Sequence, residues 1–294
     1  MRRIDNFLMA RLKGLPRTRI YQMLRRGEVR VNKGRIKQGY RLQTGDIVRV
    51  PPVTLAAPLD PGLPPIYMQN MIAAAVLFED DNIIALNKPS GIVVHSGSGR
   101  SFGVIEVLRY LRPGDRNLQL VHRIDQATSG CLLLCKNAAG LKNLHLAFRG
   151  GHVEKKYTAL LKGDIGKKTI NLDVALKKNQ GSSGERLVKV DAAGKPAQTS
   201  FRRTMLFQQT CMADIVIDTG RTHQIRVHAQ HIGHPVAGDS KYGDEDLNRI
   251  LRHQGLKRLF LHASTLRLAN YGRRGLTIAA PLSVELEKFI AGHR

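Results

Sequence analysis

One carboxylate, Asp125, lies between an apolar stretch and a Thr-Ser-Gly turn, and only Ile124 separates it from His122 and Arg123. A carboxylate that attacks a substrate or removes a proton must be partly buried, held in place and kept ionised by a nearby cation. Residues 120–130, Leu-Val-His-Arg-Ile-Asp-Gln-Ala-Thr-Ser-Gly, offer this setting. The same residue types also fit an aspartate that only bonds the backbone of the following turn. The carboxylate alone therefore leaves catalysis and local structure as alternatives.

The His-Arg dipeptide before Asp125 is also found in the catalytic loop of protein kinases. A kinase carries His-Arg-Asp together with a glycine-rich loop, a strand lysine and Asp-Phe-Gly. This set is missing from the chain. The glycine-rich residues 97–103 do not have the G-x-G-x-x-G spacing and lie outside any clear βαβ unit, so we do not predict a dinucleotide site.

A second polar group occupies residues 219–228, Thr-Gly-Arg-Thr-His-Gln-Ile-Arg-Val-His. Thr222 is expected to cap a helix that presents Ile225 and Arg226 one turn later. Four histidines in and after this segment suggest a metal site, but they lack the H-E-x-x-H spacing and a nearby acidic ligand. We therefore predict no metal and interpret the histidines as RNA contacts or helix-end donors. They are His223, His228, His231 and His234.

Tyr157 follows two lysines at the start of a predicted strand. Its ring could stack on a base and its hydroxyl could form a hydrogen bond, although most strand tyrosines are packing residues.

Short apolar runs after residue 76 predict strands at 83–87, 131–135, 157–162, 201–205, 212–217 and 260–268. Helices are expected near 103–111, 138–149, 222–232, 245–254 and 283–291. The strands outnumber the helices and do not alternate with them regularly. The pattern indicates an α+β fold with a central mixed or antiparallel sheet.

Residues 1–50 form a separate basic unit with 14 Lys and Arg against three acidic residues, a net charge of +11. Two helices are expected, the second capped by Thr18, and then a hairpin that turns at 32–34. A solvated basic face would explain the charge, but its density favours RNA contact. The predicted RNA-binding residues are Arg17, Arg19, Arg25, Arg26, Lys33 and Arg35.

Six of the twelve prolines fall in residues 51–65. Proline removes backbone donors and stiffens the chain, which predicts a semi-extended tether. We therefore divide the chain into an RNA-binding domain (1–52), a proline-rich linker (53–75) and a catalytic domain (76–294).

The chain has 294 residues and a net charge of +24, which indicates a polyanionic partner, most simply a nucleic acid. It has neither an apolar run near 18 residues nor an apolar signal-peptide region, so we expect no membrane association. Its three cysteines, Cys131, Cys135 and Cys211, are interpreted as reduced core residues of a cytoplasmic protein. No obligate protein partner is evident.

Together these segments resemble the RluA-type pseudouridine synthases. His122 to Asp125 with Thr128 to Gly130 is similar to the family motif H-R-L-D-x-x-T-S-G, although Ile124 replaces the usual Leu and Gln126 a common Arg. Further motifs follow in the family's order, and the first fifty residues resemble an S4 RNA-binding domain. These motifs are Lys156-Tyr157, Gly194 to Thr199 and Gly220 to Arg226. Residues 3–8, 26–32 and 98–106 point to the RluC branch, which acts on 23S ribosomal RNA.

The resemblance implies a role for each matching residue. Asp125 corresponds to the catalytic carboxylate, Arg226 to the arginine that ion-pairs with it, and Ile225 to an apolar residue beside the uracil. Tyr157 corresponds to the tyrosine that stacks on the base and assists removal of the C5 proton, and Arg123 to a side chain that fills the space of the flipped uridine. Substrate contacts are also expected from other motif residues, namely His122, Arg221 and His223.

The implied reaction cuts the glycosidic C–N bond, turns the uracil and joins C5 to C1′. It is an isomerisation, so we expect no cofactor, and the implied partner is 23S ribosomal RNA or the assembling large ribosomal subunit. The uridine must leave its stack before a side chain can reach it, which costs a few kcal/mol. The residues leave three roles open for Asp125: attack on the base, attack on the sugar, or removal of a sugar proton.

Two other classes of function explain the sequence less completely. A non-catalytic RNA-binding or ribosome-assembly factor would explain the charge but not the combination of Asp125, Tyr157 and Arg226. An RNA hydrolase should show paired carboxylates or a metal cluster, and the sequence has neither.

Overall fold

The computed structural model describes residues 2–12, 14–53, 62–96, 102–180 and 186–293. The chain divides into two compact units, residues 1–62 and 63–294, and each is described by itself. The proposed linker residues 54–61 and the first four residues of the 98–106 motif (98–101) lie outside the described residues.

The N-terminal unit contains two helices and three short strands. They are α1 (Ile4–Arg11), α2 (Arg17–Arg26), β1 (Arg30–Val31), β2 (Gly34–Arg35) and β3 (Val48–Arg49). Asn32 and Lys33, with φ of 48° and 68°, form the tight turn between β1 and β2, as the sequence predicts. The prediction that Thr18 caps the second helix is wrong: α2 begins at Arg17, and Pro16 precedes it without a side-chain cap.

The second unit is built on one large mixed sheet. Among the described residues, ten strands belong to it, and the main path runs β4-β5-β7-β14-β8-β13-β12-β9. Within that path, the pairing of β14 with β7 is parallel and the other pairings are antiparallel. The strands of the sheet are β4 (Val76–Glu79), β5 (Ile83–Lys88), β6 (Gln119–Leu120), β7 (Ser129–Cys135), β8 (Val153–Lys162), β9 (Ile170–Asp173), β12 (Gln198–Leu206), β13 (Thr210–Ile217), β14 (Leu261–Leu268) and β15 (Leu276–Ala279).

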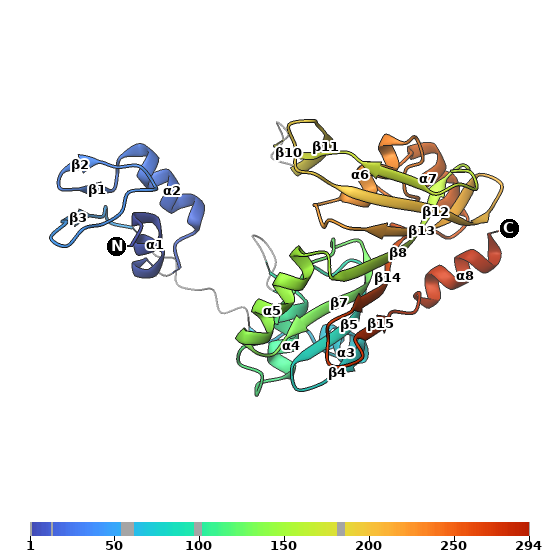
Figure 1. Cartoon of the computed structure of the whole chain (residues 1–294), viewed down its shortest axis with the longest axis horizontal. Coiled ribbons are helices and arrows are strands. Elements are labelled where there is room, and N and C mark those ends of the chain that lie inside the picture. Colours follow the sequence, from blue (N-terminus) through green and yellow to red (C-terminus); the bar gives the residue numbers. More distant parts are fainter. Residues whose placement is uncertain (1, 13, 54–61, 97–101, 181–185, 294) are drawn as a thin grey trace. The chain divides into compact units, whose positions relative to one another are not determined.

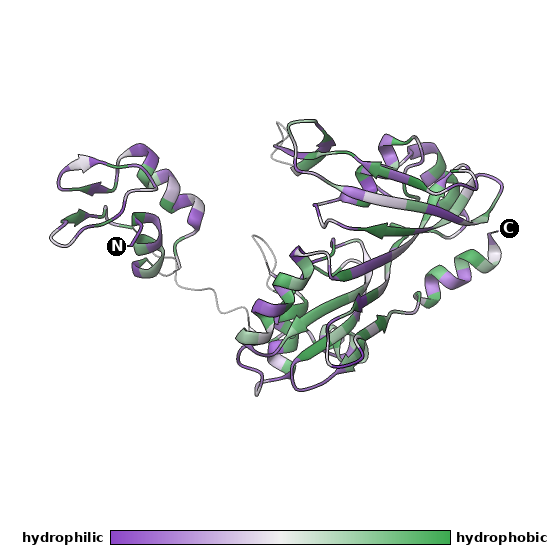
Figure 2. Cartoon of the chain, viewed as in Figure 1, coloured by the Kyte–Doolittle hydropathy of each residue, from purple (hydrophilic) through white to green (hydrophobic). Residues whose placement is uncertain are grey.

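All six strands expected after residue 76 are present, and the predicted α+β class with a mixed sheet is confirmed. The predictions missed β4, β6, β9 and β15, as well as β10 (Leu176–Gln180) and β11 (Arg186–Val190), which pair as a separate hairpin. Most of the missed strands span only two to five residues and are partly exposed, so they lack a long apolar run. Figure 2 shows the contrast, because most of β7 and the first four residues of β5 are hydrophobic.

Five helices lie where the sequence predicts them, within two residues at each end. They are α4 (Val104–Leu111), α5 (Ala138–Arg149), α6 (Gln224–His231), α7 (Glu245–His253) and α8 (Val284–Gly292). Figure 1 shows α4 and α5 beside β5 and β7, and α6 and α7 beside β12 and β13. The three cysteines are buried and unpaired, which confirms their assignment to the core.

The structure differs from the sequence prediction in the second half of the proposed linker. Residues 66–74 form a helix, α3 (Ile66–Ala74), whose Met68 and Ile72 are buried in the core of the second unit. The helix begins directly after its N-cap, Pro65, where a proline removes no hydrogen bond of the helix because an N–H there would have no partner within it. The prediction of a linker was therefore wrong for residues 66–74. The prolines just before this helix were interpreted as part of a tether, whereas they precede a helix start.

The parallel contact between β7 and β14 depends on Gly130. Its φ is 109°, and a Cβ at this position would lie 2.2 Å from the carbonyl oxygen of Ala263. Any larger residue would push the two strands apart. This explains the glycine of the Thr-Ser-Gly turn, and it fixes the loop that precedes β7.

Candidate active site

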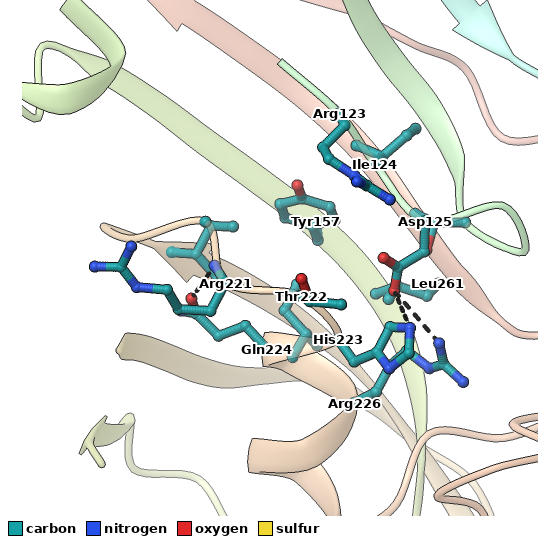
Figure 3. Close-up of a pocket in the computed structure, with 14 residues that line it drawn as sticks. Arg123, Ile124, Asp125, Tyr157, Arg221, Thr222, His223, Gln224, Arg226 and Leu261 are labelled. Carbon is teal, nitrogen blue, oxygen red and sulfur yellow. Dashed lines mark hydrogen bonds and ion pairs between the residues drawn. The ribbon is translucent and has the colours of Figure 1, made fainter. Parts of the chain in front are cut away.

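Asp125 lies in the loop between β6 and β7, on the face that α6 approaches (Figure 3). Its backbone carbonyl accepts the N–H of Thr128 at 3.2 Å, which closes a turn after the carboxylate. The Asp125 side chain is 20% exposed, so it is partly desolvated yet open to a ligand. This is the setting that the sequence predicts for a reactive carboxylate.

Hydrogen bonds from Lys88 hold the Asp125 loop against the end of β5. Lys88, the last residue of β5, is fully buried, and its Nζ donates to the carbonyls of Pro89, Ile92 and Gln126 at 2.7, 2.9 and 3.1 Å. Burial and the charge of Arg258 lower the pKa of Lys88 to about 7, and Asp125 opposes this shift. The buried lysine thus ties β5 to the residue that follows Asp125.

Two cationic or ionisable side chains from the α6 region face Asp125. Nη1 of Arg226 lies 3.4 Å from Oδ2 of Asp125, and Nε2 of His223 lies 3.9 Å from the same oxygen. Figure 3 shows both side chains directed at the carboxylate, with Arg123 and Tyr157 further along the pocket. A carboxylate beside a fixed guanidinium is stabilised in its ionised form.

Arg226 is itself held by a residue that the sequence analysis missed. Asp239, whose side chain is fully buried, accepts hydrogen bonds from Nε and Nη2 of Arg226 at 2.6 and 2.7 Å. Burial alone would lower the pKa of Arg226, but the bonds and charge of Asp239 outweigh it, so the pKa of Arg226 is raised. This fork-to-fork pairing fixes the arginine in one orientation.

Sequence spacing gave no signal for Asp239 or Lys88. Asp239 lies 13 residues after Arg226 and Lys88 lies 37 residues before Asp125, so each contact exists only after folding. The only local feature in the sequence is the glycine before Asp239. In the structure, Gly238 has a φ of 74°, and a Cβ there would lie 2.0 Å from the carbonyl oxygen of Arg258, so the turn requires glycine. A glycine before a lone carboxylate can thus mark a tight turn.

The wall opposite Asp125 is apolar. Tyr157, in the middle of β8, lines the same cavity as Ile225 of α6 and Leu261 of β14. Burial raises the pKa of Tyr157, and the charge of Asp125 raises it further, so the phenol keeps its proton at neutral pH. The ring can therefore support a flat base, and its hydroxyl remains a hydrogen-bond donor.

Three adjoining cavities meet at Arg123. The central one, about 80 Å³, contains Asp125 and Tyr157, and cavities of about 660 and 490 Å³ lie on either side of it. Arg123 lines all three. The flanking cavities are lined by further basic residues, among them Lys155, Arg149, Arg221, Arg252, Lys257 and Arg258.

The remaining predicted substrate residues have protein partners. Nε2 of His122 accepts the backbone N–H of Leu133, and its ring stacks on Phe148. Burial lowers the pKa of His122 to about 4, so the ring is neutral and packs as part of the protein. Arg221 donates to the carbonyl of Pro196, and Figure 3 shows it pointing away from Asp125.

The other polar residues of the 219–228 segment connect α6 to the sheet. Gln224 donates to Thr199 and to the carbonyl of Gln198, and His228 bonds Thr199 and the carbonyl of Val174. The N-cap of α6 is His223, not Thr222 as predicted, and its φ of 55° is left-handed. Among the described residues, no group of His, Cys, Asp and Glu could hold a metal ion.

The six predicted RNA-binding residues of the N-terminal unit fall into two groups. Arg19 and Arg26 pair with Glu28 at 2.9 and 3.9 Å. The others are exposed, and Arg25 and Arg35 line a cavity of about 560 Å³ together with Tyr21. These four are Arg17, Arg25, Lys33 and Arg35, and Arg26 is exposed as well despite its pairing.

Comparison with known families decides what this arrangement is. Residues 82–231 match the model described as RNA pseudouridylate synthase, and residues 2–48 match the S4 domain. The chain belongs to the RNA pseudouridylate synthase family. Members of this family isomerise uridine in RNA, so the family and enzyme class expected from the sequence motifs are confirmed.

Two curated relatives are similar along almost their whole length. Ribosomal large subunit pseudouridine synthase C of Haemophilus influenzae is 49% identical over 290 residues, covering 96% of this chain and 88% of that protein. The protein of the same name from Escherichia coli K12 is 47% identical over 291 residues, covering 97% and 91%.

Solved structures agree with the family assignment. Human RNA Pseudouridylate Synthase Domain Containing 1 has a TM-score of 0.59 at 25% identity, covering 71% of this chain and 83% of that chain. Human RNA Pseudouridylate Synthase Domain Containing 4 has the same fold, with a TM-score of 0.63 at 23% identity over 77% of this chain and 97% of that chain. No described helix is long and apolar enough to cross a membrane.

Proposed function

We propose that this enzyme converts uridine to pseudouridine in the 23S ribosomal RNA of the large subunit, in the cytoplasm, with Asp125 as its catalytic carboxylate. The observation that carries the proposal is the 3.4 Å approach of Arg226 to Asp125 in a small cavity walled by Tyr157. The substrate RNA is inferred from relatives named large subunit pseudouridine synthases.

The three cavities suit different parts of the substrate RNA. The central cavity of about 80 Å³ suits one flat group and is too small for a stretch of stacked RNA. A uridine must therefore leave the stack to meet Asp125. Arg123, at the junction of all three cavities, is placed to fill the space that the base vacates, and the two basic cavities suit the neighbouring nucleotides.

Within the central cavity each side chain has a distinct task. Asp125 must be ionised for attack on the base, for attack on the sugar or for removal of a sugar proton, and Arg226 provides the stabilising charge in each case. Tyr157 and Ile225 hold the uracil between a ring and an aliphatic surface. Because the Tyr157 phenol stays protonated, it serves first as a stacking surface and donor, and can accept the C5 proton only after passing on its own.

The proposed function is tested by Asp125→Asn, which removes the charge at nearly constant volume. Pseudouridine in 23S RNA is mapped by carbodiimide-induced reverse-transcription stops in cells that lack the gene and carry the wild type or the variant. The stops should disappear with Asp125→Asn and persist with Asp246→Asn, whose side chain on α7 is 82% exposed. Turnover of purified Asp125→Asn within about tenfold of wild type would exclude the carboxylate role, because essential catalytic groups cost far more.

A further inference from the structure

Tyr242 contacts both side chains that face Asp125, although it lies behind them. It belongs to the turn that follows Asp239, is 4% exposed, and packs in a small cluster with Val227 of α6 and Val188 of β11. Nothing in its sequence position connects it with the reaction. Its contacts concern the polar groups of the active site, and they use both the hydroxyl and the ring.

The hydroxyl of Tyr242 defines which nitrogen of His223 carries the hydrogen. The hydroxyl oxygen accepts the backbone N–H of Val188 at 3.0 Å and lies 2.9 Å from Nδ1 of His223. If Nδ1 were the donor, the buried hydroxyl hydrogen would have no acceptor among the described residues. The hydroxyl therefore donates to Nδ1, and the ring hydrogen of His223 is on Nε2, the atom that faces Asp125 at 3.9 Å.

The ring of Tyr242 supports the other neighbour of Asp125. The guanidinium carbon of Arg226 lies 5.0 Å from the ring centroid, within the range of a cation–π contact. Asp239 grips the edge of the same guanidinium and also accepts the backbone N–H of Tyr242 at 3.1 Å. One short turn thus holds Arg226 by its edge and by its face.

His223 needs such support because its own backbone is strained. It has a φ of 55°, which a non-glycine residue adopts only when its surroundings hold it there. Burial lowers the pKa of His223, so the imidazole is neutral at neutral pH and has a choice of tautomer. A neutral ring with an unfixed tautomer would present a lone pair to the Asp125 carboxylate in part of the molecules.

We propose that Tyr242 is a positioning residue for the isomerisation, which orients Arg226 through its ring and fixes His223, through its hydroxyl, in the tautomer whose Nε2–H faces Asp125. This inference rests on the catalytic role proposed for Asp125. The Nε2–H at 3.9 Å is too far for a hydrogen bond in the free enzyme. It is placed to shorten onto Asp125, or onto a substrate oxygen beside it, when RNA closes the site.

The test uses Tyr242→Phe, which keeps the ring and removes the hydroxyl. Single-turnover rates at saturating 23S fragment should fall about tenfold, the value of one lost hydrogen bond, while the RNA dissociation constant stays within about twofold. Tyr271→Phe is the matched control, because it also removes a tyrosine hydroxyl that forms a hydrogen bond, in this case by donating to the carboxylate of Asp80. Tyr271→Phe should react at the wild-type rate.

Two further measurements separate positioning from general stability. The ring ¹⁵N shifts of His223, assigned by their loss in His223→Gln, should report a protonated Nε2 in the wild type and a mixture of tautomers in Tyr242→Phe. The double variant Tyr242→Phe/His223→Gln should be no slower than His223→Gln alone, because the hydroxyl acts through the histidine.

A wild-type rate for Tyr242→Phe, a loss of RNA affinity without loss of rate, unchanged ring shifts or additive effects in the double variant would each overturn the inference. Asp125→Asn in the same assay separates the two proposals. If Asp125→Asn is inactive and Tyr242→Phe is normal, only the positioning role fails. If Asp125→Asn remains active, the proposed function itself fails.

Discussion

Arg226 and Arg25 carry the same charge in very different surroundings. The Arg226 side chain is 7% exposed and has two short bonds to Asp239, whereas Arg25 is exposed on the last turn of α2. A buried guanidinium with fixed partners occupies one position, which a reaction requires. An exposed arginine samples many positions, so it attracts phosphates collectively and is screened by salt. Changes in the first setting should alter the rate, and changes in the second should alter affinity.

The largest expected effect comes from Arg226→Ala. It removes the cation beside Asp125 and leaves Asp239 as a buried carboxylate without its partner. Single-turnover rates should fall by about 10³ or more, and the protein should also lose about 3–5 kcal/mol of stability. Arg202→Ala, which removes an exposed arginine paired with Asp214 on the same sheet, should change neither quantity appreciably. An active Arg226→Ala enzyme would show that the Arg226–Asp125 contact has no role in the reaction.

A smaller, pH-dependent effect is expected from Lys88→Met. The folded chain binds the Lys88 proton with a pKa of about 7, against an ordinary value of 10.5 for the unfolded chain. Between these values the unfolded chain holds a proton that the folded chain has released, so stability due to this residue rises with pH. The free energy of unfolding of the wild type, relative to Lys88→Met, should increase by up to about 1.4 kcal/mol per pH unit in this window.

Denaturant titrations at pH 7, 8.5 and 10 measure this difference, with the surface substitution Lys142→Met as the control. If the free energies of unfolding of the wild type and of Lys88→Met change with pH in the same way, the buried lysine does not titrate in this range. The measurement distinguishes a buried cation from an exposed one, because only burial lowers the pKa of a lysine far enough for its proton to affect stability at these pH values.

The sequence predicted the Asp125 loop and the position of α6 well because their signals are local. Apolar runs mark β5 and β7, and the motif around Asp125 is a continuous stretch of eleven residues. The pairing of Asp125 with Arg226 came from the family resemblance, since 101 residues separate them. The structure places these two side chains in contact, together with Tyr157 and Ile225 around one cavity.

Sequence reasoning missed the residues that hold the cavity residues in place. Asp239, Tyr242 and Lys88 act through bonds between segments that are distant in the chain, and no periodicity or spacing encodes such bonds. His122 has protein contacts that its place in the motif did not predict, because its ring packs on Phe148 and accepts the backbone N–H of Leu133, while its expected substrate contact stays a prediction. Short exposed strands and α3 were missed because local patterns there are weak or dominated by proline.

The smallest effect on turnover is expected from removing the N-terminal unit. Residues 1–50 carry +11 of the total +24, and Arg17, Arg25, Lys33 and Arg35 are among their exposed cations. If the unit contacts four phosphates, deleting residues 1–52 should reduce the slope of log affinity against log salt by about three. Single-turnover kinetics of both forms on a 23S fragment at several salt concentrations measure slope and rate together.

The rate at saturating RNA should fall much less than the affinity, because the unit raises the local concentration of RNA without moving Asp125. An unchanged salt slope would mean that the basic face of the N-terminal unit is only a solvated surface. A truncated enzyme that binds RNA normally but does not react would instead place part of the catalytic machinery in the first 52 residues. That outcome would remove the distinction between Arg226 and Arg25, because charges in both units would then act on the rate.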